Sequence, residues 1–544
     1  MRALPILVVL LTLAASAQEN PRPATALKPH FRISGTVVNA ISGEAVSEVE
    51  VAIGKNEGSD SVQTMITAED GRFHFENLAQ GKYWLAAQGK GFPPQRFDEH
   101  ENYSTAIAVG PNVQSEDLVF RLRPDATITG SVIDEQNEPV RNAQVILFRA
   151  GVQEGTTATR VADRGQTDDR GVYRLGHQRP GIYYVAVVAQ PWYAQPRLSA
   201  QGETFRFANS SVASDQATEQ FNVAYPATYY SGSTDPSGAT PIVVKPGDVA
   251  VADFALSPVP ALRLRITGLA TSQGFGASLT QSTMGGLEIP VNGQITTSGN
   301  HEIEIDGVPP GQFDLTLQSW GKTPSSRQDH VDLTQDLQTD VSSTSAAPTI
   351  SGVVRLDTGK ALPQRAFVQL LHRGSGQNFT SQVSEKGEFE MSSQGVRPGT
   401  YDVLVFGVQN GVIRELLASG AKISGEQIEV GPSASVQLTI TLSQGVGRVD
   451  GTALRDGKPF SEAMVVLIPE DIEHNSTLVR RDQSDSDGTF SLYNVLPGKY
   501  RVIALANGWD LHWMDPGVLQ PYLGGGESIE VAARGRYNLE VNVQ

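Results

Sequence analysis

The chain of 544 residues contains no cysteine. It therefore has no disulfide bond, no thiol nucleophile and no cysteine that could carry a lipid, so each domain must be stable through packing alone. Long apolar runs are missing after the first 17 residues, which predicts no later transmembrane segment. Positive charge is also scarce, since the net charge is −17. This acidic balance disfavours nucleic acid and anionic membrane surfaces as partners.

Signatures of catalysis and of metal binding are scarce as well. The sequence has no His-Glu-x-x-His motif, no Gly-x-Ser-x-Gly motif and no Walker-type phosphate loop. His301 and Glu304 match a zinc-binding His-x-x-Glu pair, but on a strand they would point to opposite faces, and a third ligand is missing. Asp482, Asp485 and Asp487 are interpreted as a hairpin turn whose aspartates bond their own backbone, rather than as a calcium site. We expect a protein that is not an enzyme and needs neither cofactor nor metal.

A pair of turns, in contrast, recurs five times along the chain. The first turn is Asp-Gly, Arg-Gly or Lys-Gly before an aromatic residue, and its glycine is expected at positive φ. The second turn is usually Pro-Gly-x-Tyr, and its glycine is expected in the left-handed region. From the first aromatic residue to the second, the step is ten residues in four copies and twelve in the other. The third copy is worn, with Ile303 and Phe313 in the aromatic positions.

Strands are predicted on both sides of these turns. Tyr183, Val185 and Val187 alternate with less apolar residues, which is typical of a strand with one buried face, and the other copies do the same. Four copies also open with a short strand that contains a glycine, such as Gly35. Roughly seven short strands per copy, with no convincing helical periodicity after the leader, predict a β-sandwich. A chain of one module repeated five times is more often a rod or a binding array than an enzyme.

These motifs resemble the carboxypeptidase regulatory-like domain family. The resemblance is carried by the opening strand Ile33–Val37, by the Asp-Gly-x-Phe turn and by the Pro-Gly-x-Tyr strand, and it is weaker in the third copy. It implies an all-β chain: a tandem array of about five Ig-like or transthyretin-like (prealbumin-like) antiparallel β-sandwiches. It also implies a non-catalytic role, because the family is found in bacterial surface proteins and within a broader group of carbohydrate-binding-like sandwiches.

The predicted organisation starts with a signal peptide, because Arg2, an apolar run and Ala15-Ser16-Ala17 form a secretory leader. The predicted segments are the signal peptide 1–17, a Pro-rich lead-in 18–30, unit one 31–124, unit two 125–259 with a long insertion at about 194–240, unit three 260–346, unit four 347–446 and unit five 447–544. Short Pro-rich linkers are stiff spacers, and five sandwiches in line would reach on the order of 150 Å if extended.

The loop after each tyrosine strand is the best candidate for binding. In units two and five this loop carries several aromatic residues flanked by Asp, Asn and Gln. Such residues suit a sugar, which needs an apolar surface for its ring and hydrogen-bonding partners for its hydroxyls. The aromatic rings could instead cover the end of their own sandwich. The candidate ligand-binding residues are Trp509, Trp513, Trp192, Tyr229 and Tyr230. We expect an exported protein of the periplasm, cell surface or exterior that binds a polysaccharide. The alternatives are a spacer or adhesin that binds a cell-envelope protein and, remotely, a hydrolase of unfamiliar type.

Overall fold

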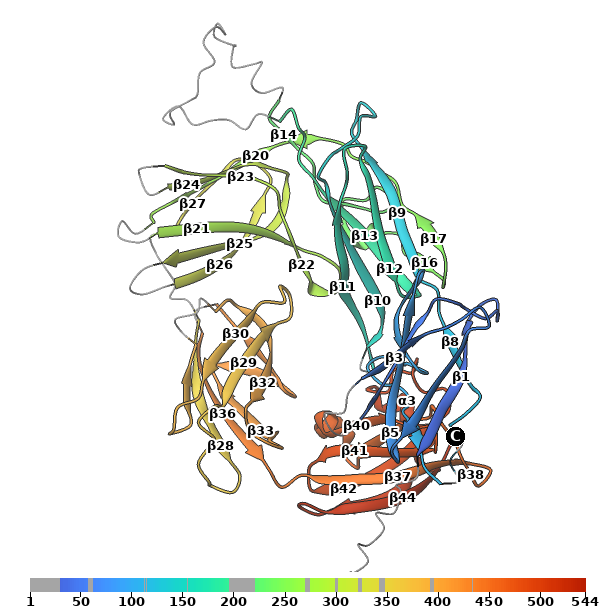
Figure 1. Ribbon diagram of the computed structural model, residues 1–544. Coiled ribbons are helices and arrows are strands. Elements are labelled where there is room, and N and C mark those ends of the chain that lie inside the picture. The colour runs from blue at the N-terminus through green and yellow to red at the C-terminus, as the bar shows by residue number, and fades with distance from the viewer. Residues whose placement is uncertain are drawn as a thin grey trace, which may run out of the picture.

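The computed structural model describes residues 30–544 except 57–61, 112, 114, 154, 195–220, 270–273, 299–301, 321–324, 342–347, 392–395 and 433. The predicted leader, the lead-in before His30 and much of the insertion in unit two lie outside the described residues. Strands dominate the rest and form successive pairs of sheets along the chain (Figure 1). The all-β fold of antiparallel sandwiches is therefore confirmed.

The strands of units one and two form two sheets in each unit, and a further short pair lies beyond them. In unit one they are β1 Phe31–Asn39, β2 Glu50–Lys55, β3 Gln63–Ile66, β4 Arg72–Leu78, β5 Gly81–Gly89, β6 Phe92–Arg96, β7 Ile107–Val109 and β8 Leu118–Leu122. In unit two they are β9 Ala126–Ile133, β10 Gln144–Gln153, β11 Thr156–Gln166, β12 Val172–Gln178, β13 Gly181–Val188, β14 Val223–Ala224, β15 Thr228–Tyr229, β16 Ile242–Val244, β17 Val249–Val251 and β18 Phe254–Ala255. The short β19 Val259–Pro260 pairs with β14 at the boundary with unit three.

Units three to five are built in the same way. Unit three has β20 Leu262–Thr267, β21 Gly274–Ser282, β22 Glu288–Pro290, β23 Gln294–Ser298, β24 Glu302–Val308, β25 Gly311–Trp320, β26 Ser325–Leu333 and β27 Leu337–Asp340. Unit four has β28 Thr349–Leu356, β29 Phe367–His372, β30 Asn378–Gln382, β31 Glu388–Glu390, β32 Gly399–Phe406, β33 Val412–Ser419, β34 Ala421–Ser424, β35 Gln427–Val430 and β36 Ser435–Ser443. Unit five has β37 Gly447–Arg455, β38 Lys458–Pro459, β39 Met464–Pro469, β40 Arg480–Gln483, β41 Thr489–Val495, β42 Gly498–Leu505, β43 Glu527–Val531 and β44 Arg536–Asn542.

Helices are short in the part of the chain that the structure describes. They are η1 Pro236–Gly238, η2 Met284–Gly286, α2 Ile472–Asn475, η4 Ser476–Leu478 and α3 Pro516–Leu523. The helix α3 differs from the expectation that the chain after the leader contains no helix. It begins where the side chain of Asp515 accepts a hydrogen bond from the backbone N–H of Gly517, and Pro516 suits the first helical position.

One strand arrangement recurs in every unit. In unit one, the opening strand β1 pairs antiparallel with the hairpin strand β4 and parallel with the closing strand β8. The opening strands β9, β20, β28 and β37 have the same two kinds of neighbour. In the second sheet of unit one, β2 pairs antiparallel with the tyrosine strand β5. Unit three shares this topology despite its worn motif.

The glycine of the opening strand lies where two neighbours leave no room for a side chain. A Cβ atom on Gly35 would lie 2.3 Å from the carbonyl oxygen of Leu118 and 2.7 Å from the Phe73 ring. The glycines at the same place in the other three units, Gly130, Gly352 and Gly451, face an equivalent carbonyl and ring. In unit three, Ile266 pairs with Ile303 instead. Two buried isoleucines therefore occupy the positions that a glycine and an aromatic ring hold in the other units.

The two predicted turns have different outcomes. The glycine of the first turn has positive φ as predicted, for example +75° at Gly488. The prediction for the second turn holds in three copies, where φ is 150° at Gly81, 158° at Gly311 and 140° at Gly399, and fails in units two and five, where Gly181 and Gly498 lie outside the positive-φ region. The left-handed residue comes four positions earlier, at Asn494, where φ is 56°. Asn494 lies at the register shift between β37 and β41, so the chain turns through a β-bulge and asparagine tolerates that conformation.

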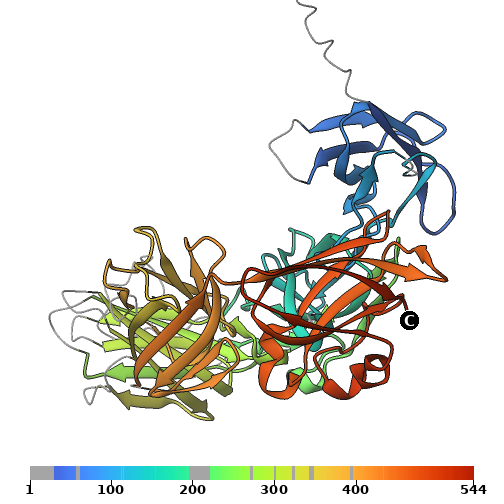
Figure 2. The ribbon, with the colours of Figure 1, turned by 90° about the horizontal axis from the view of Figure 1, so that it is seen from below.

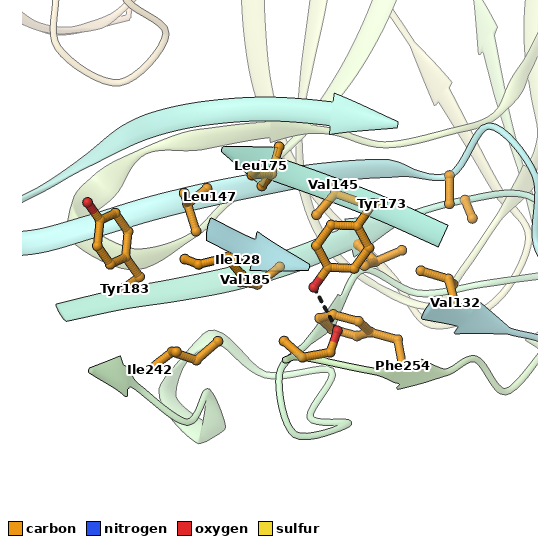
Figure 3. Close-up of a cluster of buried hydrophobic side chains, with 14 of the residues drawn as sticks. Ile128, Val132, Val145, Leu147, Tyr173, Leu175, Tyr183, Val185, Ile242 and Phe254 are labelled. Carbon is orange, nitrogen blue, oxygen red and sulfur yellow. Dashed lines mark hydrogen bonds between the residues drawn. The ribbon is translucent and has the colours of Figure 1, made fainter. Parts of the chain in front are cut away.

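The tyrosine that follows the second turn is buried in each of the four units that have it, as predicted. Its hydroxyl donates to the carbonyl oxygen four residues earlier: Tyr83 to Ala79, Tyr183 to Arg179, Tyr401 to Arg397 and Tyr500 to Leu496. Figure 3 shows Tyr173 and Tyr183 among the aliphatic side chains of the core of unit two. The tyrosine therefore fixes the turn while its ring fills the core, and Phe313 of unit three supplies only the ring.

The units do not extend in line, in contrast to the rod expected from the linkers. Consecutive units contact each other, and unit five returns to unit one (Figures 1 and 2). Representative contacts are Glu99–Arg179 between units one and two, Tyr229–Thr283 between two and three, Gly374–Glu288 between three and four, Gly425–Thr477 between four and five, and Lys82–Asp485 between one and five. The chain thus closes on itself, which sequence patterns local to each unit do not reveal.

Candidate functional site

The five predicted binding residues lie in separate places. Trp509 and Trp513 belong to the loop between β42 and α3 of unit five, where units one, two and five meet. Tyr229 and Tyr230 lie in and after β15 of unit two, and Trp192 follows β13. Their exposure differs greatly: 8% for Trp509, 6% for Trp513, 0% for Tyr229 and 86% for Trp192. Of these four rings, only that of Trp192 is largely exposed.

Trp509 is covered by unit one. Its ring stacks on the imidazole of His100, with centroids 5.1 Å apart and an angle of 9° between the planes. Its indole N–H donates to the carbonyl oxygen of Glu462 at 3.2 Å. Tyr103 covers it from a second direction at 5.5 Å. An aromatic face that a sugar could use is therefore occupied by another part of the same chain.

Trp513 is covered by the neighbouring units as well. The guanidinium carbon of Arg481 lies 4.3 Å from its ring centroid. On another side is Gly155 of unit two, where a Cβ atom would lie 2.5 Å from the indole. The adjacent Met514 N–H donates to the carbonyl oxygen of Gly155 at 3.3 Å. The tight approach requires glycine, which also suits the φ of +76° at this position.

Polar groups complete the contact between units one and five. We call this contact the clasp; its residues are Lys82 and 98–108 in unit one and Glu462, 481–489 and 509–513 in unit five. The side chain of Lys82 pairs with Asp485, and the backbone N–H of Ala106 donates to the same carboxylate at 2.9 Å. Arg481 donates to Glu101 at 2.6 Å, and its side chain is only 6% exposed. Such desolvated charge pairs position the two units specifically, although the second carboxylate oxygen of Glu101 is buried without a hydrogen-bond partner among the described residues.

The acidic turn of unit five takes part in the clasp. Asp487 and Asp482 accept hydrogen bonds from Thr489 N–H and Ser491 N–H, as expected of aspartates in a hairpin. Asp485 instead binds unit one, a contact that no local sequence pattern predicts. Burial raises the pKa of Asp482 to about 7, and burial also raises the pKa of Asp485 although Lys82 opposes that change.

The two tyrosines of the unit-two insertion pack in different places: Tyr229 contacts unit three, and Tyr230 contacts the core of unit two. The Tyr229 hydroxyl donates to Thr283 at 2.8 Å, and its ring packs with Ile289 of unit three. Tyr230 is partly buried against the core of unit two, where its ring meets Phe254 edge-on at 6.1 Å. Both rings are used in packing in this arrangement.

Trp192 belongs to an exposed aromatic group that the sequence identified only in part. Its ring meets Tyr193 edge-on at 5.8 Å, and Tyr193 meets Phe221 at 6.4 Å. The hydroxyls of Tyr193 and Tyr225 both donate to the carboxylate of Glu135. We call these five residues the aromatic surface of unit two. Phe221 and Glu135 were missed because they lie far from Trp192 in sequence, and no local pattern connects them.

The electrostatics of the aromatic surface follow from the shared carboxylate. Burial favours the neutral form of Glu135, but the hydrogen bonds from Tyr193, from its own backbone and from Tyr225 outweigh that effect and lower its pKa. Burial and the bond to Glu135 raise the pKa of Tyr193 to about 12. The surface therefore presents a fixed negative charge beside neutral phenols.

Two searches of the described ranges, for a metal-binding cluster and for a membrane-spanning helix, found no candidate. No group of three or more His, Cys, Asp or Glu side chains there could hold a metal ion. His301 lies outside the described residues, while Glu304 is buried and pairs with Arg265 at 2.6 Å. In the same part of the chain, no helix combines the length and apolar character that a membrane span requires.

Comparison with sequence families supports the resemblance for one segment. Residues 32–123 match the carboxypeptidase regulatory-like domain. Unit one is a domain of this family. No curated protein matches the chain significantly. The shared strand topology of units two to five is consistent with further copies, which remain a proposal.

Several solved structures are similar to this chain, at low sequence identity. The TIE protein of Bacillus anthracis is 11% identical, with 97% of this chain and 76% of that chain covered and a TM-score of 0.17. The Streptococcal ancillary pilin is 11% identical, with 57% and 99% covered and a TM-score of 0.19. GBS52, the minor pilin of Streptococcus agalactiae, is 12% identical, with 42% and 97% covered and a TM-score of 0.20. TM-scores this low carry no argument about arrangement or function.

Proposed function

We propose that this chain is an exported, non-catalytic scaffold that binds carbohydrate through the aromatic surface of unit two. The proposal includes a secretory leader at 1–17, a place in the periplasm or outside the cell, and five sandwiches divided near residues 124, 259, 346 and 446. Five separate clusters of buried side chains, one within each of these segments, support the division. The family of unit one supports a role without catalysis.

The observation that carries the binding proposal is the exposure of Trp192. At 86% exposure, this ring makes an edge-on contact with Tyr193 and leaves most of its surface open to a ligand. Beside it, Glu135 and the phenol of Tyr193 supply hydrogen-bonding groups for hydroxyls. A flat apolar face with polar groups at its edge suits a sugar ring, which has one apolar face and equatorial hydroxyls.

A glycan array followed by calorimetry of the mature chain tests this proposal. We expect weak binding of a polysaccharide that Trp192→Ala abolishes and Trp192→Phe retains in part, because a smaller ring still offers a face. Phe406→Ala is the matched control, since Phe406 is 50% exposed in unit four and far from Glu135 in sequence. Absence of glycan binding, or binding that survives Trp192→Ala, would remove the carbohydrate proposal.

A protein partner is the second candidate, and a different surface favours it. Val249 and Val251 of β17 and Val243 of β16 are 62%, 57% and 65% exposed. β17 is the last strand on its side of the sheet β12-β9-β17. An edge strand of this kind can pair with a strand of another chain through backbone hydrogen bonds. Under this proposal the chain is an adhesin or spacer, and Val249→Lys should weaken capture of a cell-envelope protein while leaving glycan binding unchanged.

A further inference from the structure

The carboxylate of Glu135 is the charged group of the aromatic surface of unit two. One of its oxygens accepts a hydrogen bond from the hydroxyl of Tyr193, and the other accepts one from the hydroxyl of Tyr225 at 2.9 Å. Glu135 lies in the turn between β9 and β10, whereas the two tyrosines belong to the segments that follow β13 and β14. Three segments that are distant in sequence therefore hold this carboxylate in one place.

The groups that bond to Glu135 are all neutral. They are the two phenols, its own backbone and the side chain of Gln136. The charged contacts that the described part of unit two forms lie elsewhere: His177 with Asp125, and Arg179 with Glu99 of unit one. Glu135 is also exposed to solvent. The protein thus holds an accessible carboxylate to which none of its described residues supplies a positive charge.

The charge on this carboxylate is maintained at neutral pH. Burial acts against ionisation, but the hydrogen bonds from Tyr193, from the backbone and from Tyr225 lower the pKa of Glu135. Burial and the same carboxylate raise the pKa of Tyr193 to about 12 and that of Tyr225 as well, so both phenols stay neutral. The charge of Asp134 also acts on both phenols. The site is therefore negative, and it favours a cationic ligand.

Aromatic rings lie beside the carboxylate. Trp192, which is 86% exposed, contacts the ring of Tyr193 edge-on, and Phe221 contacts the same tyrosine from the other end of the insertion. The face of an aromatic ring attracts a cation through its π electrons, and tryptophan does so most strongly. A single tyrosine therefore connects an open tryptophan face to a fixed negative charge, and these are the two features that bind an ammonium group.

We propose that the aromatic surface of unit two selects polysaccharides that carry protonated amines. A sugar ring stacks on Trp192, and an ammonium group on the same or the next sugar lies beside Glu135. The inference rests on the proposed carbohydrate binding and names the class of sugar. A neutral hydroxyl also donates to a carboxylate, but only an ammonium group adds the opposite charge and the attraction to the aromatic rings. An amino sugar thus uses every feature of this surface.

Calorimetry of the full chain with two sugar hexamers tests this selection. β-1,4-linked hexamers of glucosamine and of N-acetylglucosamine share one backbone, but only the first carries amines that are protonated at pH 5.5. We expect about tenfold tighter binding of the glucosamine hexamer at physiological ionic strength, from one exposed ion pair and one cation–π contact.

Variants locate the preference. Glu135→Gln should remove most of the preference for the glucosamine hexamer, whereas Trp192→Ala should abolish binding of both hexamers. The whole chain has a net charge of −17, which attracts any polycation, so a control for charge is needed. Glu390→Gln is the matched control, because it removes the same charge from an exposed acid of β31 in unit four and should keep the preference.

The comparison of the two hexamers on the parent chain does not depend on how a variant folds. Equal affinity for both would overturn the selection of amines and leave the carbohydrate proposal standing, whereas binding of no glycan would remove both. A preference that survives Glu135→Gln would also overturn the inference. So would hexalysine that binds as tightly as the glucosamine hexamer, because charge alone would then explain the binding without a sugar ring.

Discussion

The loops after β13 and after β42 occupy the same place in the repeat and contain the same kinds of residue, yet their surroundings are opposite. In unit two, Trp192 is 86% exposed, whereas Trp513 in unit five is 6% exposed. The difference arises from neighbours rather than from the loops: Arg481, His100 of unit one and Gly155 of unit two cover the rings of unit five. Similar aromatic loops can thus be exposed or buried, depending on the units that surround them.

The largest expected difference between the two loops is in stability. Trp513→Ala should lower the free energy of unfolding of unit five by about 3–5 kcal/mol, because it leaves a cavity at a junction of three units. Trp192→Ala should change it by no more than about 0.5 kcal/mol, as is usual for exposed sites. Chemical denaturation of the full chain measures both. Equal effects would show that the two loops are equivalent and that the interface of unit five contributes little.

The second largest loss in the free energy of unfolding is expected when the side chain of Arg481 is removed. Arg481→Ala leaves the partly buried carboxylate of Glu101 without its partner and removes the cation above Trp513, so we expect a loss of about 3 kcal/mol. The double variant with Glu101→Ala should recover part of the loss, since no charge then remains unpaired. A double-mutant cycle by urea denaturation measures the coupling, and additive losses would contradict a direct contact.

The sequence determines each sandwich far better than the assembly of sandwiches. Period-two alternation, the Asp-Gly turns and the buried tyrosines such as Tyr500 are local signals, and they predicted the strands and the core. The bulge at Asn494 was missed because the adjacent Pro-Gly is a stronger turn signal than a single asparagine. The clasp joins residues about 380 apart, such as His100 and Gln483, and a single sequence has no pattern that connects them.

A smaller effect distinguishes the two tryptophans of unit five. The indole N–H of Trp509 donates to Glu462, whereas that of Trp513 has no hydrogen-bond partner among the described residues. Replacement by phenylalanine keeps a ring at both sites but removes one hydrogen bond only at the first. Trp509→Phe should therefore cost about 1 kcal/mol more than Trp513→Phe in the free energy of unfolding. Equal costs would indicate that ring area alone determines the contribution of this loop.

The smallest expected effect concerns pH and is confined to the aromatic surface of unit two. The lowered pKa of Glu135 means that its hydrogen bonds from Tyr193 and Tyr225 stabilise unit two above the ordinary glutamate value of 4.5 and are lost as pH falls through the lowered one. Glu135→Gln should therefore reduce the acid dependence of the tyrosine signals of unit two, measured by NMR between pH 3 and pH 6. Tyrosine signals that titrate identically in the parent chain and in Glu135→Gln would show that this carboxylate does not organise the aromatic surface, and the exposed ring of Trp192 would then lose the polar partner on which its proposed role depends.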